Sequence, residues 1–356
     1  MRKILFTLLL AVTGSLLWAQ NECAYTLEEA QDLFDAGQIE TIPEKLSGCL
    51  ETGFTREEVM QAYKLIILAH LFDDNIVEAD KMMLAFLNIF PDYDPLATDP
   101  REFTALLESY DTDPVIMVGI TAGPNFSLPV ITDRSGTYNL NDYRGNYVPG
   151  GAGYQFGARV ELPLADKLEL CGELAFFSSR YDYYLDTEPT GSVFTGEITD
   201  WSLIEYYEGQ NWLQVPLTVR YNFLKRKFTP YVNIGIVPGV LFRAIADGNR
   251  IYQNTGDVRY DPIPLLNIDE IRTIRRVFNL AASVGTGVKY DLGSGIFFMD
   301  IRFQAGLFNL YKPGSDRFIN SLAYDLLYIP EDMILNNLAI SVGYMLPIYN
   351  PKKKGE

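Results

Sequence analysis

Charged side chains recur at alternating positions of several apolar segments, where they could pair with one another inside a fold. They are Arg159, Glu161, Glu169, Glu173, Arg220, Lys289, Asp291, Asp300 and Arg302. Buried charges must be paired, because an isolated buried charge is strongly destabilising. The mixture of both signs therefore predicts an ion-pair network. A narrow selective pore lined by these charges is one alternative, and a ligand-binding or catalytic use is another.

Catalysis that depends on histidine has a single candidate residue, His70. Histidine is the usual proton acceptor near neutral pH, but His70 lies in the apolar run from Leu65 to Phe72, where a packed helix residue is expected. No G-x-S-x-G motif, phosphate-binding loop or zinc-ligand spacing occurs. The acidic residues around Asp92 and Asp99 lack the spacing of an EF-hand. We therefore predict no enzyme activity, no catalytic residue, no metal site and no cofactor.

The cysteine positions predict one disulfide. Cys23 precedes the first expected helix and Cys49 ends the second, so the two meet in an antiparallel helical hairpin. In an oxidising compartment such a pair forms a disulfide. Cys171 falls on an inward-facing strand position, where an inert buried thiol is expected.

The first residues indicate export from the cytoplasm. Met1-Arg2-Lys3 is followed by an apolar run from Ile4 to Trp18 and then by Ala19, which is the pattern of a secretory signal peptide. A membrane-spanning anchor is the alternative, but the run is shorter than the ~20 apolar residues that a spanning helix needs. We therefore assign residues 1–19 to a signal peptide.

The net charge of −17 is concentrated in one part of the chain. Residues 20–113 contain 21 acidic and 5 basic side chains, a net charge of −16, whereas residues 114–356 contain 25 acidic and 22 basic ones, a net charge of −3. This asymmetry predicts two domains with different surroundings. It also argues against nucleic acid as a partner, because phosphate binding needs clustered lysine and arginine.

Helical periodicity runs through the acidic part of the chain. We expect helices near residues 27–36, 42–51, 56–72, 75–90 and 100–110. Capping boxes are expected at Thr26 with Glu29 and at Thr55 with Glu58, because each pair satisfies free N–H groups at a helix start. Asp99 is expected to cap the last helix, before a proline at its first position.

The two middle helices resemble one tetratricopeptide-type unit. The residues at its packing positions are Tyr63, Ile66, His70, Ala79, Met83 and the terminal Pro91. Phe86 and Ile67 stand where the repeat has small residues. One unit does not form the groove of a repeat array, because about three are needed for stability. The resemblance implies a small all-α helical-hairpin domain over residues 20–113.

From Val115 onward the periodicity becomes alternating, most clearly in residues 211–223 and 338–348. The pattern predicts eight strands, near residues 115–127, 152–164, 167–181, 211–223, 228–244, 277–292, 295–309 and 338–348. Alternation of lipid-facing apolar residues with lumen-facing polar residues is typical of a transmembrane β-barrel. An aromatic content of 13% favours the same class.

Connections between the expected strands alternate in length. The short ones lie near residues 165–166, 225–226 and 293–294, and the long ones near 128–151, 182–210, 245–276 and 310–335. Outer-membrane barrels have short periplasmic turns and long extracellular loops. We therefore expect a mainly β protein of the outer membrane of a Gram-negative bacterium, with an eight-stranded antiparallel barrel over 114–349 and a basic periplasmic tail over 350–356. A soluble β-sandwich, and ten strands with an extra hairpin at 193–208, are the alternatives.

One run of strand residues is similar to a known family. Trp212-Leu213-Gln214-Val215-Pro216-Leu217 leads to Arg220-Tyr221, and Pro230-Tyr231-Val232 follows with Gly235. These residues resemble the PorT-like outer-membrane β-barrel family over about residues 115–349. The resemblance implies the barrel fold. Some members of that family act in type IX protein secretion, while many have no assigned role.

Two basic clusters stand on the side of the barrel where the acidic helices are expected. Lys225, Arg226 and Lys227 occupy a tight turn, and Lys352, Lys353 and Lys354 occupy the tail. We expect the acidic domain to dock against these six residues. Attraction of the basic residues to anionic lipid headgroups is the alternative.

These features together predict a non-enzymatic outer-membrane barrel that anchors a periplasmic helical interaction domain, as a structural or scaffold component of the envelope. The expected contacts are outer-membrane lipid and a periplasmic or envelope protein partner. An accessory component of a type IX-like secretion machinery and a narrow channel are the alternatives.

Overall fold

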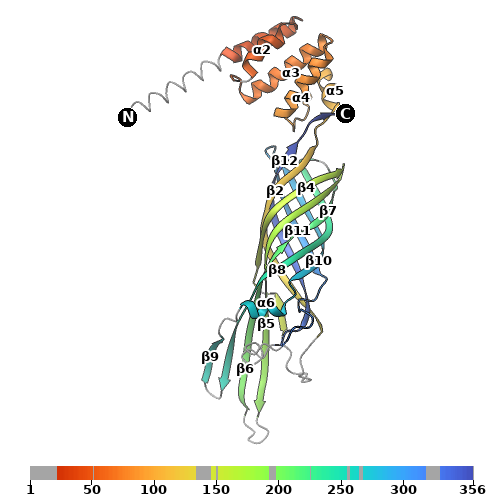
Figure 1. The fold of residues 1–356 in the computed structure, drawn as a ribbon. Coiled ribbons are helices and arrows are strands. Elements are labelled where there is room, and N and C mark those ends of the chain that lie inside the picture. Colours follow the sequence, from red (N-terminus) through yellow and green to blue (C-terminus); the bar gives the residue numbers. More distant parts are fainter. Residues whose placement is uncertain are drawn as a thin grey trace, which may run out of the picture. The chain divides into compact units, whose positions relative to one another are not determined.

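The chain folds as two compact units (Figure 1). The computed structural model describes residues 22–50, 52–133, 146–149, 151–191, 198–224, 226–254, 257–263, 268–317 and 329–355. The helical unit comprises the described residues up to Val115 together with those from Tyr349 onward, and the barrel unit comprises Ile116–Ile348. The expected signal peptide, residues 1–19, and Lys225 of the basic turn lie outside the described residues.

Helices of the helical unit follow the expected order. Residues 22–35 form the first helix, and after it come α2 (Ile42–Leu50), α3 (Arg56–Phe72), α4 (Ile76–Ile89) and α5 (Arg101–Glu108). None of the described helices is long and apolar enough to cross a membrane.

Two apolar clusters hold these helices together. The first helix, α2 and α3 meet around Ala30, Ile42 and Ile66, all of which are buried. Helices α3, α4 and α5 meet around Phe86 and Phe103, whose ring centroids lie 5.7 Å apart. Full burial of a side chain the size of phenylalanine contributes about 1.5–3 kcal/mol.

A disulfide between Cys23 and Cys49 joins the first helix to the end of α2. Their Cα atoms are 5.7 Å apart, and the cross-link closes a loop with a sequence separation of 26 residues. A link of this kind constrains the unfolded chain and contributes about 2–4 kcal/mol. The packing of these two short helices is therefore reinforced by a covalent bond.

Of the two expected capping boxes, one is present. The Glu58 N–H donates to Thr55 Oγ1 at 3.3 Å, and the Thr55 N–H donates to Glu58 Oε2 at 2.7 Å. The prediction of a capping box at Thr26 was wrong, because Thr26 is not at the start of the helix, which already includes Glu22. The Thr26 hydroxyl lies within that helix and donates to the Glu22 carbonyl at 2.9 Å.

Asp99 holds a loop of the helical unit in place and does not cap α5 as expected. Pro100 is the residue at the N-cap, and it makes no side-chain cap. The Asp99 carboxylate accepts a hydrogen bond from Lys64 Nζ at 2.7 Å, one from the Leu96 N–H at 2.8 Å and one from the Tyr93 hydroxyl. Burial alone would raise the pKa of this carboxyl, but the three donors hold its pKa below the usual value.

The carboxyl-terminal tail belongs to the helical unit, where it completes a two-stranded sheet. Strand β13 (Lys352–Lys353) pairs antiparallel with β1 (Tyr110–Asp111). Lys353 Nζ contacts Asp80 Oδ2 at 2.5 Å, and the Tyr110 hydroxyl donates to Asp80 Oδ1 at 3.0 Å. Lys354 Nζ donates to the Glu108 carbonyl at the end of α5 at 2.8 Å, a favourable position for a cation.

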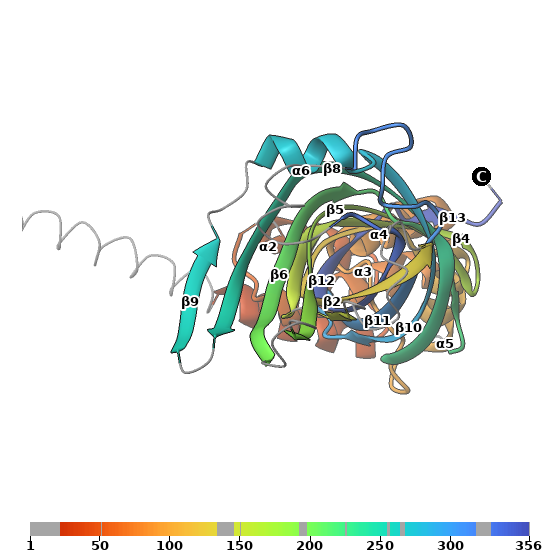
Figure 2. The ribbon, with the colours of Figure 1, turned by 90° about the horizontal axis from the view of Figure 1, so that it is seen from below.

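Strands of the barrel unit close into one ring, and eight of those described form it. In chain order they are β2 (Pro114–Asp133), β4 (Gly153–Ala165), β5 (Leu168–Gly191), β6 (Ile198–Gln214) continued by β7 (Leu217–Asn222), β8 (Phe228–Asn254), β10 (Phe278–Asp291), β11 (Ile296–Gly306) and β12 (Asp332–Tyr349). Each pairs antiparallel with its neighbour, and β12 pairs with β2 to close the ring (Figure 2).

Closure of the ring brings the backbones of β2 and β12 very close together. A Cβ atom at Gly119 would collide with the carbonyl oxygen of Tyr344, and one at Gly123 with that of Ile340. Glycine is therefore required at both positions of β2 for this close approach.

Side chains alternate between the two faces of the barrel wall, as the sequence predicted. Ile120 and Ile234 on the outer face are 70% and 67% exposed, whereas the neighbouring Thr121 and Asn233 point inward and are buried. An apolar outer face of this kind suits contact with lipid. We refer to the end with the short connections as the turn end of the barrel and to the other as the loop end.

The strands β5, β6 and β8 extend much further than the alternation suggested. Of the residues expected in long connections, 182–191, 198–210 and 245–254 form strand instead. Two short strands join this extension, β3 (Asn146–Pro149) along β5 and β9 (Asp257–Ile263) along β8. Residues 198–208 continue a ring strand and add no further pair to the described ring, which excludes the ten-stranded alternative. Helix α6 (Ile268–Ile274) follows β9 and packs beside β8 at the rim (Figure 2).

Replacement of Asp99 by asparagine should weaken the helical unit at neutral pH but not at acidic pH. The folded-state pKa of Asp99 lies below its unfolded value of about 3.8, so its contribution is complete above that pH and is lost as the pH falls through the folded-state value. We expect Asp99→Asn to lower the free energy of unfolding by about 1–3 kcal/mol at pH 7. Helical circular dichroism during denaturant titration of the full chain measures it, with the exposed Asp92→Asn as control. An equal loss in both variants would contradict this role.

Candidate functional site

The predicted charged set comes together inside the barrel near its turn end. Arg159 and Glu161 lie on β4, Glu169 and Glu173 on β5, Arg220 on β7, Lys289 on β10, and Asp300 and Arg302 on β11, and all eight are buried. The prediction that Asp291 lies inside with the other charges was wrong, because its side chain is exposed. It stands at the last position of β10, where its carboxylate accepts the Gly293 N–H of the turn at 2.7 Å.

The network has two halves that share Arg159. In the first, Arg159 contacts Glu173 at 3.0 Å and Asp300 at 2.9 Å. Arg302 contacts the same two carboxylates, at 3.0 and 3.4 Å. Four side chains from three different strands are therefore held by mutual ion pairs.

The second half gathers around Glu161. This carboxylate contacts Arg220 and, at 2.6 Å, Lys289 Nζ. Lys289 contacts Glu169 at 2.6 Å, and Arg159 Nη1 approaches Glu161 at 3.9 Å, which connects the two halves. Aromatic faces cover two of the guanidinium groups, with Phe298 at 4.3 Å from Arg159 and Tyr231 at 4.0 Å from Arg220.

The charges of these eight residues balance. The cations are Arg159, Arg220, Lys289 and Arg302, and the anions are Glu161, Glu169, Glu173 and Asp300. An eight-stranded barrel leaves an interior just wide enough for side chains to fill. Pairing offsets the desolvation of each charge, and the chain places a full set of partners in this interior.

One group of potential metal ligands lies within the network. Glu161, Glu169 and Cys171 have ligand atoms within 4.8 Å of one another. Both carboxylates are already paired, Glu161 with Arg220 and Glu169 with Lys289. The geometry fits a structural plug.

A second interior cluster fills the loop half of the barrel. Its buried apolar members are Phe177, Tyr181, Tyr183, Tyr206, Trp212, Leu241, Ala244, Ala246, Ile271, Ile274, Leu310, Tyr311, Met333 and Leu335. Against this cluster Arg275 forms an ion pair with Glu208 at 2.5 Å, and both side chains are fully buried. A cavity of about 30 Å³ lined by Gln214 and Gln304 lies beside it, which is large enough to hold a water molecule.

Sequence reasoning missed the pair of Glu208 and Arg275. The alternation of residues 211–223, continued backward, places Glu208 on the same inward face as Gln210 and Trp212, so this signal was present. Arg275 lies in a connection after α6, where no periodicity assigns a direction to its side chain.

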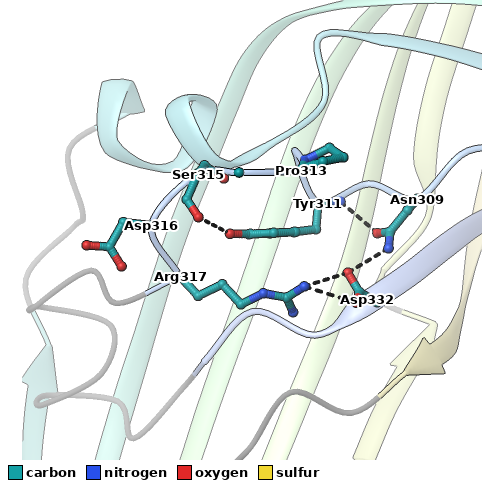
Figure 3. A pocket seen from close by; sticks show the side chains of 8 residues that line it. Asn309, Tyr311, Pro313, Ser315, Asp316, Arg317 and Asp332 are labelled. Atoms are coloured by element: carbon teal, nitrogen blue, oxygen red, sulfur yellow. Dashed lines mark hydrogen bonds and ion pairs between the residues drawn. The ribbon is translucent and has the colours of Figure 1, made fainter.

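An open pocket near the loop end is lined by side chains that contact one another (Figure 3). The Arg317 guanidinium lies 3.8 Å from the centre of the Tyr311 ring and pairs with Asp332 at 2.9 Å. Asn309 Nδ2 donates to the same carboxylate at 2.6 Å. Because these groups satisfy one another, we assign no ligand to the pocket.

The remaining predicted residues are dispersed. Lys353 and Lys354 contact Asp80 and the Glu108 carbonyl within the helical unit, while Lys352 is exposed. Arg226 and Lys227 are exposed in the turn between β7 and β8. His70 is half-buried near the end of α3.

A closed ring with charged side chains inside and an apolar outer face is typical of β-barrels that span a membrane. The comparison with protein families points to the same class. Residues 115–312, more than half of the chain, match the model described as outer membrane protein beta-barrel domain. The chain belongs to this family. It is therefore an outer-membrane β-barrel protein, and the outer face described above is the lipid-facing one. No curated protein sequence matches the chain.

Solved outer-membrane proteins are similar to this chain at low sequence identity. The attachment invasion locus protein Ail of Yersinia pestis is 10% identical, with 66% of this chain and 99% of that chain covered and a TM-score of 0.26. OprG of Pseudomonas aeruginosa is 12% identical, covering 66% and 98%, with a TM-score of 0.32. The outer membrane protease OmpT of Escherichia coli is 9% identical, covering 65% and 96%, with a TM-score of 0.33. These likenesses carry no statement about activity.

Neutralisation of Glu161 should destabilise the barrel strongly. In Glu161→Gln the buried Arg220 and Lys289 lose the carboxylate that they share, and removal of one partner of a buried ion pair costs about 3–5 kcal/mol. Denaturant unfolding in lipid vesicles measures this loss. The matched control is Glu205→Gln, because Glu205 lies on the outer face of β6, away from the network. This change should alter the free energy of unfolding by less than about 0.5 kcal/mol.

The double variant Glu161→Gln/Lys289→Met restores the balance of charge and should be less destabilised than Glu161→Gln alone. A single variant as stable as the Glu205→Gln control would show that the network does not stabilise the barrel.

Proposed function

We propose that the barrel is a closed anchor that holds the helical unit on the periplasmic side of the outer membrane. The observation that carries the proposal is the filled interior, with the charge-balanced network near the turn end and the aromatic cluster in the loop half. Interior side chains that contact one another stabilise the barrel and leave little room for a solute to pass. We assign the protein no catalytic role, because its one histidine lies in the helical unit.

The helical unit is the part that we propose to bind an envelope partner. Four large apolar side chains of α4 remain exposed, and they are Ile76, Val77, Leu84 and Ile89. Exposed apolar groups gathered on one helix are typical of a contact surface. We propose that Arg226 and Lys227 attract the acidic unit. Their contribution is auxiliary, because each exposed ion pair contributes no more than about 1 kcal/mol.

An accessory role in type IX-like protein secretion is the second candidate. It is favoured by the similarity of residues 212–221 and 230–235 to the PorT-like family. In that case the helical unit would contact a component of the secretion machinery instead of a structural envelope protein.

Purified wild-type protein in planar lipid bilayers should show no steady conductance, because the lumen is blocked at two levels. Heat-modifiable migration on gels checks that the protein used is folded. Regular, ion-selective openings from the wild-type barrel would refute the closed anchor and establish the narrow channel.

A photo-crosslinking residue at Val77, which is 65% exposed on α4, should capture an envelope protein in cells. The same crosslinker at Phe156 on the outer face of β4 should capture lipid, and it serves as the control. A secretion component captured at Val77 would support the second candidate. Lipid adducts alone at Val77 and at the other exposed α4 positions would overturn the partner-binding role.

A further inference from the structure

The buried carboxylate of Glu208 is arranged to receive a planar, forked cation. Arg275 Nε donates to Glu208 Oε1 at 2.8 Å and Arg275 Nη2 donates to Oε2 at 2.5 Å, so the contact is bidentate. Arg275 Nη2 also donates to the Tyr181 hydroxyl at 3.1 Å. Both charged side chains are fully buried. Such paired, parallel hydrogen bonds are specific for guanidinium and are not reproduced by an ammonium group.

The anionic side of this site is built by the barrel wall alone. The Tyr206 hydroxyl donates to Glu208 Oε2 at 2.8 Å, and Gln210 Nε2 donates to Glu208 Oε1 at 2.6 Å. Trp212 Nε1 in turn donates to Gln210 Oε1 at 3.1 Å. These residues stand at every second position of β6 and therefore share one face. Their contacts hold the carboxylate from the side of the wall.

The cation comes from outside the wall, from the segment 271–276. This segment comprises the second half of α6 and the two residues after it. Ile271 and Ile274 are buried in the aromatic cluster. The backbone of the segment is fastened at two points, since the Lys312 N–H donates to the Ile274 carbonyl and the Arg276 N–H to the Leu310 carbonyl, each at 2.8 Å. Arg272 on the same segment is exposed.

We propose that Glu208 and Tyr181 form a guanidinium-binding site of the barrel wall, and that Arg275 is its resident ligand. The bound guanidinium fixes the segment 271–276 against the wall and completes the aromatic cluster. This contact acts together with the two backbone hydrogen bonds and the buried isoleucines that hold the segment. This inference does not rest on the proposed anchoring function.

Chemical rescue of an Arg275→Ala variant tests the proposal. Free guanidinium at millimolar concentration should bind the vacated position and stabilise the folded barrel. Its effect should saturate, and the unfolding constant should fall by about tenfold once guanidinium exceeds its Kd tenfold. Urea, which has a similar shape but no charge, and ammonium, which has the charge but no fork, should not stabilise it. Arg275→Lys should be destabilised despite its retained charge.

Trypsin cleavage at the exposed Arg272 supplies an independent readout. Cleavage should be faster in Arg275→Ala than in wild type, and guanidinium should slow it again while urea does not. The matched variant Arg275→Ala/Glu208→Gln should show no protection. If Arg275→Ala does not fold alone, its refolding yield with each additive is measured instead. Equal effects of guanidinium, urea and ammonium, or rescue that persists without Glu208, would overturn the site.

Discussion

A charge that leaves water inside a narrow barrel must find its counter-charge in the same barrel, and this constraint governs the interior of the protein. The wall supplies four cations and four anions near the turn end, and every one of them has a partner of opposite sign. Because the partners come from β4, β5, β7, β10 and β11, the ion pairs form only when these strands stand in the correct register. The electrostatic requirement is therefore also a requirement on topology.

The same constraint explains which part of the site could be predicted. Side chains on a strand alternate strictly, so Arg159, Glu161 and Arg220 were assigned to the interior from position alone. The assignment depends on where each strand ends. Asp291 was placed inside by the same alternation, but β10 ends there and the side chain turns to solvent. The ion pair of Glu208 and Arg275 was not predicted, because the residues that extend β6 were assigned to a loop. Its cation also comes from a segment without periodicity.

In the helical unit, features set by neighbouring residues could be predicted from the sequence, whereas contacts between distant residues could not. The Thr55 capping box depends on four consecutive residues and was predicted correctly. The role of Asp99 depends on Lys64, which is 35 residues away in sequence, and no local pattern contains that information. The segments that pack by apolar periodicity were found within a few residues of their observed ends, whereas single polar contacts between distant segments were not.

The pairing of β1 with β13 has a consequence for the order of synthesis. The helices of the helical unit are translated before any barrel strand, yet Asp80 and the end of α5 receive their partners from Lys353 and Lys354 at the far end of the chain. The intervening barrel residues must all be synthesised before these contacts can form. Helices that are translated before the barrel strands therefore obtain these contacts only after those strands have been made.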